Sequence, residues 1–79
     1  MTGYHVTTQR KLARCTQTGA ILSPVRFWQY RDSAVAWARR TGRTVILEIA
    51  PTESYPLPDH KPRGHARWTP ELVRRWIKL

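Results

Sequence analysis

The stretch that decides the fold is "RTVILEIAP", residues 43–51. Val45, Leu47 and Ile49 point to one face of an extended chain, and the residues between them are also mostly apolar. Because both faces are largely apolar, we expect a strand in the interior of a sheet. Glu48 is the acidic exception. A buried carboxylate needs a partner, so we expect a salt bridge from Glu48 to an arginine such as Arg26.

Two helices are predicted on the N-terminal side of this strand. The segment "YHVTT", residues 4–8, is rich in β-branched and aromatic residues and predicts a strand. A helix should follow over residues 9–17, and "ILSPVRFWQY", residues 21–30, should form one broken strand or two short ones before a second helix over 33–41. The expected N-cap and stop residues are Thr7 or Thr8 with Gly19, and Asp32 or Ser33 with Gly42.

The C-terminal third has a different composition. Residues 51–66 contain four prolines, which favours an ordered but irregular loop. Thr69, Pro70 and Glu71 then resemble the N-cap and first turn of a helix, which predicts a third helix over residues 70–78.

Together these elements predict a single α+β domain over residues 1–79. We expect a small mixed or antiparallel sheet of three to four strands with two to three short helices packed on it. Cys15, the one cysteine, excludes an intramolecular disulfide and should pack in the core. No apolar run approaches the roughly 18 residues that span a bilayer, so we expect a cytoplasmic monomer without a membrane partner.

Charge is the strongest global feature of the sequence. Fourteen lysines and arginines face five acidic residues, giving a formal net charge of +9, and no acid precedes Asp32. Such a field attracts polyanions. We therefore predict a small, basic, non-catalytic binding domain that occupies a negatively charged surface, either nucleic acid or the nucleic-acid-binding groove of a protein complex. The residues predicted to bind are Arg10, Lys11, Arg14, Arg26, Arg31, Arg63, Arg67, Arg74, Arg75 and Lys78.

A compact and strongly basic chain of this kind also fits an inhibitor carried by a phage or mobile element, such as an anti-CRISPR protein. No metal is expected. Asp59, His60 and His65 are close in sequence, but they lack a cysteine pair and the spacing of a helical histidine pair.

Two segments resemble ADP-ribosyltransferase-like domains: "YHVTTQRKLARCTQTGAILSP", residues 4–24, and "VRFWQYRDSAVAWARRTG", residues 25–42. The tail "YPLPDH…RWTPELVRRW" is similar to that of small members of the group. The resemblance implies, as the alternative function, a minimal NAD-dependent enzyme. In it His5 would contact NAD, Tyr30 or Trp28 would stack on the nicotinamide, and Glu48 would be the catalytic acid.

The chain departs from that pattern at the acid. Glu48 comes too early in the sequence for the family's late glutamate, and residues 61–68, where that glutamate is expected, contain no acid. This departure implies that the fold is kept and the catalysis is lost. We therefore expect no enzymatic activity and no cofactor.

Overall fold

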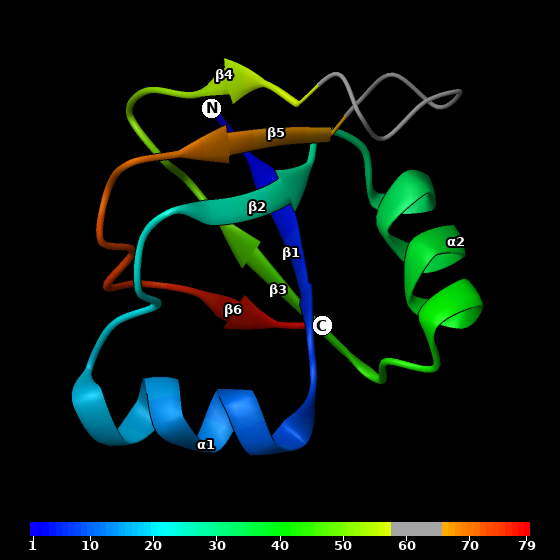
Figure 1. The fold of residues 1–79 in the computed structure, drawn as a ribbon, viewed down its shortest axis with the longest axis horizontal. Helices are drawn as coiled ribbons and strands as arrows, with labels where there is room; N and C mark the ends of the chain where they lie inside the picture. Colours follow the sequence, from blue (N-terminus) through cyan, green and yellow to red (C-terminus); the bar gives the residue numbers. More distant parts are fainter. Residues whose placement is uncertain (58–65) are drawn as a thin grey trace.

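The computed structural model describes residues 1–57 and 66–79. Within these ranges the chain forms two helices and six strands (Figure 1). The elements are β1 (Gly3–Thr7), α1 (Gln9–Thr18), β2 (Val25–Trp28), α2 (Arg31–Thr41), β3 (Val45–Ile49), β4 (Tyr55–Pro56), β5 (Ala66–Thr69) and β6 (Ile77–Lys78).

The α+β class is confirmed, but the sheet is larger than predicted. Its order is β4-β5-β2-β1-β3-β6, and each of its strand pairs is antiparallel. The extra strands are β4 and β6, which have two residues each and lie at the two edges. Strands this short carry no periodicity in the sequence, so only their pairing partners reveal them.

The predicted interior strand is confirmed as β3. It pairs with β1 along five residues, from Gly3↔Ile49 to Thr7↔Val45, and with β6 on its other side. Val45 and Leu47 are completely buried.

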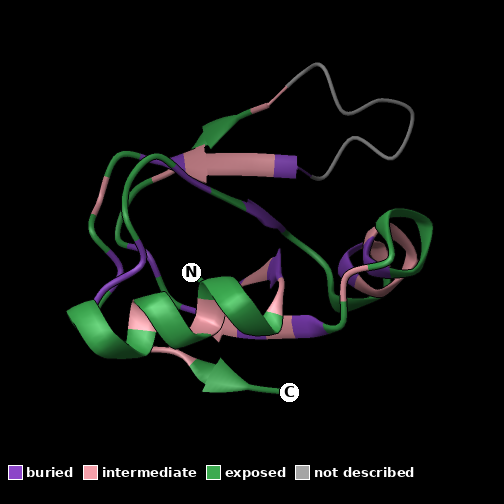
Figure 2. Ribbon diagram, turned by 60° about the horizontal axis from the view of Figure 1, so that its bottom comes forward, coloured by how far each residue is buried: buried purple, intermediate pink, exposed green. Residues whose placement is uncertain are grey.

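The sheet separates two apolar clusters. One contains Val25, Phe27, Val45, Leu47 and Ile49 with two residues outside the strands, and Leu12 and Cys15 of α1 pack against it. The other contains Val6, Trp28 and Ala66 with Ala34 and Ala38 of α2. Figure 2 shows the difference between the helices: α2 buries its inner alanines, whereas α1 has no fully buried residue.

The helix ends are mostly as predicted. The Thr8 hydroxyl accepts the backbone N–H of Lys11 at 3.2 Å, and Gly19 ends α1 with a φ of 81°. Gly42 ends α2 in the same left-handed conformation. The predicted cap of α2 is wrong, because the helix begins earlier, with Tyr30 as an N-cap that makes no side-chain cap bond. Asp32 instead lies in the first turn, where its charge favours the positive end of the helix.

The predicted helix over residues 70–78 is wrong. Thr69 is completely buried at the end of β5, opposite Val25, so the chain is still extended where the cap was expected. Val73 then exchanges two backbone hydrogen bonds with Ile21, and Ile77 pairs with Glu48. A helix of nine residues is marginal by itself, so these pairings override the local signals.

The loop predicted over residues 51–66 is partly wrong, because Tyr55 and Pro56 pair with β5. Residues 58–65 of that loop lie outside the described part of the chain. No helix in the described part is long and apolar enough to cross a membrane.

Candidate functional site

The candidate site is a pocket at the junction of β1 and β2. These strands share one residue pair, Tyr4↔Trp28, and then β1 runs across β2 at a steep angle (Figure 1). Next to that pair, His5 of β1 contacts β2 through its side chain. Its Nδ1 lies 2.6 Å from the carbonyl oxygen of Arg26. The pocket beside this contact has a volume of about 260 Å³.

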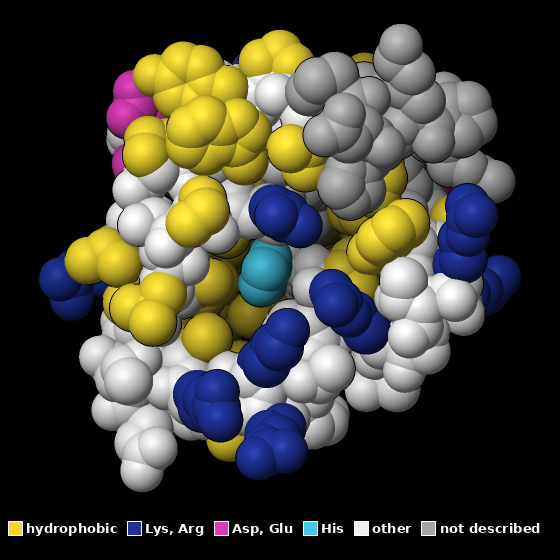
Figure 3. Space-filling model, viewed as in Figure 1, with side chains coloured by type: hydrophobic (Ala, Val, Ile, Leu, Met, Phe, Trp, Pro, Cys, Tyr) yellow, Lys and Arg dark blue, Asp and Glu magenta, His cyan; other side chains and the backbone are white. Residues whose placement is uncertain are grey.

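Three cationic side chains line the pocket, each from a different element. Lys11 comes from the first turn of α1, Arg26 from β2, and Arg43 from the turn between α2 and β3. No aspartate or glutamate of residues 1–57 or 66–79 is among the lining residues. Figure 3 shows a histidine in a hollow with lysine and arginine side chains around it, while the acidic side chains of this view lie away from the hollow. The pocket therefore presents a concentrated positive potential.

The hydrogen bond fixes the tautomer of His5. A carbonyl oxygen only accepts, so Nδ1 must carry the proton that it donates to Arg26. Burial lowers the pKa of His5 below its usual value; the bond to Arg26 opposes that shift, and the charges of Arg43 and Lys11 add to it. In the free protein at neutral pH the ring is therefore neutral, and its Nε2 is unprotonated.

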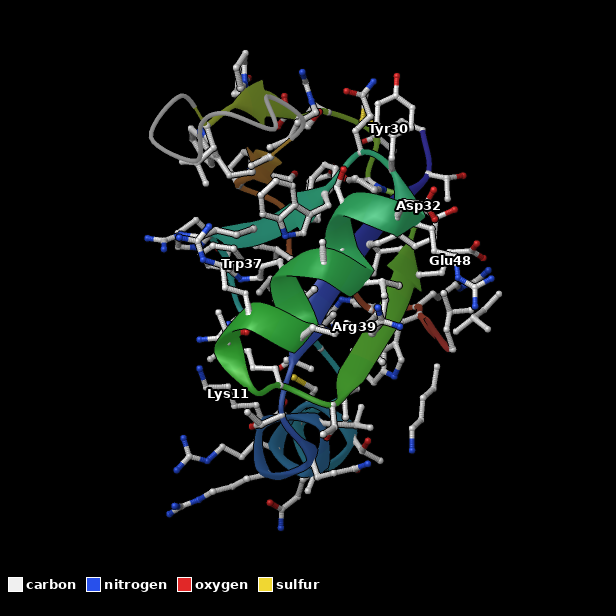
Figure 4. The ribbon with its side chains drawn as sticks, turned by 90° about the vertical axis from the view of Figure 1, so that its right-hand side faces the viewer. Lys11, Tyr30, Asp32, Trp37, Arg39 and Glu48 are labelled. Atoms are coloured by element: carbon white, nitrogen blue, oxygen red, sulfur yellow. The ribbon has the colours of Figure 1, made fainter. Side chains whose placement is uncertain are left out.

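Two tryptophans form an aromatic wall of the pocket. The ring centroids of Trp28 and Trp37 are 5.6 Å apart, with the planes tilted by 49°. Trp28 is buried in the core beneath α2, and Trp37 is partly buried. In Figure 4, Trp37 lies on the same side of α2 as Lys11, and both residues line the pocket.

The sequence predicted two of the three cations. Lys11 and Arg26 line the pocket, and Arg43 was missed. The available signal was its position, since an arginine directly after the helix-ending Gly42 and before a buried strand is held at a turn between two packed elements.

The other predicted binding residues lie elsewhere. Arg67 donates from Nε to the Ser54 hydroxyl at 2.7 Å and from Nη2 to the Ser54 carbonyl at 3.0 Å, so it ties β5 to the segment before β4. Arg63, with Asp59, His60 and His65, lies outside the described residues. The remainder are at exposed positions of α1, the start of α2, the C-terminal segment and β6: Arg10, Arg14, Arg31, Arg74, Arg75 and Lys78.

The residues of the alternative enzyme are brought together only in part. His5 and Trp28 line the pocket, but Tyr30 and Glu48 do not. Figure 4 shows Tyr30 and Glu48 on the side of α2 opposite Lys11 and Trp37. Glu48 borders a separate hollow that is lined in part by Arg75 and Trp76.

The predicted salt bridge between Glu48 and Arg26 is also wrong. Strand β1 lies between their two strands, which separates the backbones by roughly 10 Å at the usual strand spacing. Glu48 forms no ion pair with any described residue. It is only half-buried, so it does not need one.

Comparison of the chain with protein-family models, curated proteins and solved structures finds no significant match. The resemblance to ADP-ribosyltransferase-like domains therefore stays a prediction from the residues quoted above. Within residues 1–57 and 66–79 there is no cluster of three metal-ligating side chains.

Proposed function

We propose that this protein is a non-catalytic nucleic-acid-binding domain, and that it contacts its ligand with the face around the β1–β2 pocket. The observation that carries the proposal is the convergence of Lys11, Arg26 and Arg43 on one pocket that no acidic residue of 1–57 or 66–79 lines. Cations brought together from three separate elements repel one another, which is a cost that a bound anion removes.

The chemistry of the pocket favours nucleic acid over an acidic protein groove. Arginine and lysine bind phosphate oxygens, and aromatic rings stack on bases in a sequence-tolerant way. Trp37 lines the same pocket as the three cations, so a phosphate and its neighbouring base could be held together. Tryptophan and arginine are also common at protein interfaces, so the experiment below includes an acidic protein partner among its outcomes.

Matched charge reversals test the proposal. The pocket variant is Arg26→Glu with Arg43→Glu, and the control is Arg74→Glu with Arg75→Glu, which changes the net charge equally in the C-terminal segment. Affinity for a labelled single-stranded 20-mer is measured by fluorescence anisotropy. Two lost charge-assisted contacts should weaken binding by about 100-fold in the pocket variant, whereas the control should lose about threefold or less.

Other outcomes of this experiment would contradict the proposal. Equal losses in the two variants would mean that total charge, and not the pocket, determines affinity. If the wild type binds neither DNA nor RNA but does bind an acidic protein, the surface is a protein-binding one. The melting temperature of each variant shows whether it is folded.

A second candidate is the NAD-dependent ADP-ribosyltransferase-like enzyme, which is favoured by the position of His5 in the pocket. The absence of Tyr30 and Glu48 from the described lining makes it the weaker candidate. A thermal-shift assay separates the two. At 100 times its dissociation constant NAD would stabilise the protein by about 2.7 kcal/mol, and the absence of any shift at millimolar NAD would exclude this enzyme.

A further inference from the structure

The pocket is a blind depression, closed on its inner side by the core. Val6, Phe27 and Trp28 are lining residues and are only 6%, 2% and 6% exposed. Its volume of about 260 Å³ is just below the range of roughly 300–1,000 Å³ for pockets that enclose a drug-sized ligand. A nucleic-acid strand that crosses this face can place one small group, such as a terminal phosphate, inside the pocket.

The charge of the pocket is matched to a phosphate monoester. Lys11, Arg26 and Arg43 together bring three positive charges. An internal phosphodiester carries a single negative charge, whereas a monoester carries about −1.5 to −2 at pH 7. A terminal phosphate therefore neutralises the pocket more completely than a phosphate within a strand.

A buried hydroxyl also lines the pocket. Thr7 is 3% exposed, and its hydroxyl makes no hydrogen bond to any described residue. Buried polar groups normally have a partner, because an unmade hydrogen bond costs free energy. A phosphate oxygen in the pocket would supply one.

We propose that the pocket binds the terminal phosphate monoester of a nucleic-acid strand, held by Lys11, Arg26 and Arg43 with hydrogen bonds from the Thr7 hydroxyl and from Nε2 of His5. This inference rests on the proposed function and specifies its ligand. Internal phosphates of the strand contact the surrounding basic face, and a phosphodiester in the pocket is bound more weakly than the monoester.

Binding of the monoester requires His5 to take up a proton. The charged groups around the ring are Lys11 from α1, Arg26 from β2 and Arg43 from the turn after α2, with no carboxylate among the described lining residues. These cations and burial keep the free ring neutral. A bound dianion offsets the cations, so Nε2 becomes protonated and donates to the phosphate. The preference for a phosphorylated strand should therefore rise as the pH falls from 8 to about 6.5, above the second pKa of the phosphate, which is about 6.

The test compares three oligonucleotides of one sequence, with a 5′-phosphate, a 3′-phosphate or hydroxyls at both ends. At pH 7 the wild type should bind one phosphorylated form at least about tenfold more tightly than the hydroxyl form, the equivalent of one charge-assisted hydrogen bond. The preference should vanish in Arg26→Glu/Arg43→Glu and persist in Arg74→Glu/Arg75→Glu. Thr7→Val, which removes the hydroxyl and keeps the shape of the side chain, should reduce the preference.

His5→Asn tests the proton. The asparagine amide can still donate to the Arg26 carbonyl, but it cannot take up a proton. The preference of this variant for the phosphorylated strand should therefore rise less than that of the wild type as the pH falls from 8 to 6.5. The titration of the phosphate itself is common to both proteins. If the variant and the wild type show the same pH dependence between 8 and 6.5, the role of His5 is overturned.

The outcomes separate the two proposals. If the wild type binds all three strands equally, the monoester inference is overturned and the proposed function stands. If it binds none of them, the proposed function fails as well. Adenosine monophosphate and inorganic phosphate serve as competitors. Competition by either that matches the phosphorylated strand would overturn the assignment to a strand end.

Discussion

Gly3 is the residue where the packing of the sheet leaves no room for a side chain. A Cβ built on Gly3 would overlap Cδ2 of Phe27 and lie 2.6 Å from its Cε2. Phe27 is 2% exposed and belongs to the same cluster as Leu47 and Ile49. The phenyl ring therefore lies against the backbone at the start of β1, close to the point where β1 and β2 diverge.

Replacing Gly3 with alanine should destabilise the protein by roughly 1–3 kcal/mol, the usual cost of an overpacked core. Urea denaturation followed by tryptophan fluorescence measures the loss. The matched experiment places Gly3→Ala in a Phe27→Leu background, where the smaller side chain should recover part of the loss. An unchanged unfolding midpoint in the single variant would contradict the close packing at this position.

His5 shows how far sequence reasoning reaches at the scale of one residue. The sequence singled out His5 because it lies in the first strand, and the structure places it in the pocket. Its bond to Arg26 was not predictable, because it depends on the angle at which β1 leaves β2. Arg43 and the Thr7 hydroxyl were missed because only the folded chain places them beside His5 in the lining of one pocket.

At the scale of elements, the sequence predicts the helices and longer strands well where local signals and tertiary packing agree. Both α1 and α2 have the expected glycine stops, and the alternating apolar residues of β3 are buried as expected. The prediction of a helix in the C-terminal segment is wrong because the side chains that resemble a helix cap make other hydrogen bonds. Thr69 and Glu71 do not cap a helix. Glu71 instead caps the turn that follows β3, and the Thr69 hydroxyl donates to the Glu71 carboxylate.

The Glu71 carboxylate joins the C-terminal segment to that turn. It accepts the backbone N–H groups of Thr52 and Glu53 at 2.8 and 3.0 Å, and the Thr52 and Thr69 hydroxyls at 2.6 and 3.1 Å. The pKa of Glu71 is lowered below its usual value. The largest cause is the hydrogen bond from the Thr52 side chain, and the second is the hydrogen bond from the Glu53 backbone. The ionised form is thus favoured by folding.

The pH dependence of stability follows from this direction. A carboxylate with a lowered folded-state pKa stabilises the protein above its unfolded pKa, which is near 4.5, and that contribution is lost as the pH falls through the lower folded value. We expect Glu71→Gln to melt at a lower temperature than the wild type at pH 7. The difference should shrink between pH 5 and pH 3. A difference in melting temperature between the variant and the wild type that stays constant from pH 5 to pH 3 would contradict the assigned role of Glu71.

At the scale of the whole molecule, the distribution of charge matters more than its total. The net charge of +9 predicts a polyanion partner but cannot say which surface meets it. Folding brings three cations from different parts of the sequence to one pocket, and the face around that pocket is rich in lysine and arginine (Figure 3). The sequence therefore predicts the kind of partner, whereas the candidate surface is found only in the folded chain.

The salt dependence of binding tests the central claim most directly. For single strands, log K falls against log salt concentration with a slope of about −0.7 per phosphate neutralised, so the wild type should show a slope of at least about that size. Arg26→Ala with Arg43→Ala, which removes two of the cations around the one phosphate in the pocket, should make the slope shallower by about 0.7, whereas Arg74→Ala with Arg75→Ala should change it little. A wild-type slope near zero, or the same change in both variants, would contradict the claim that nucleic acid is bound at this pocket.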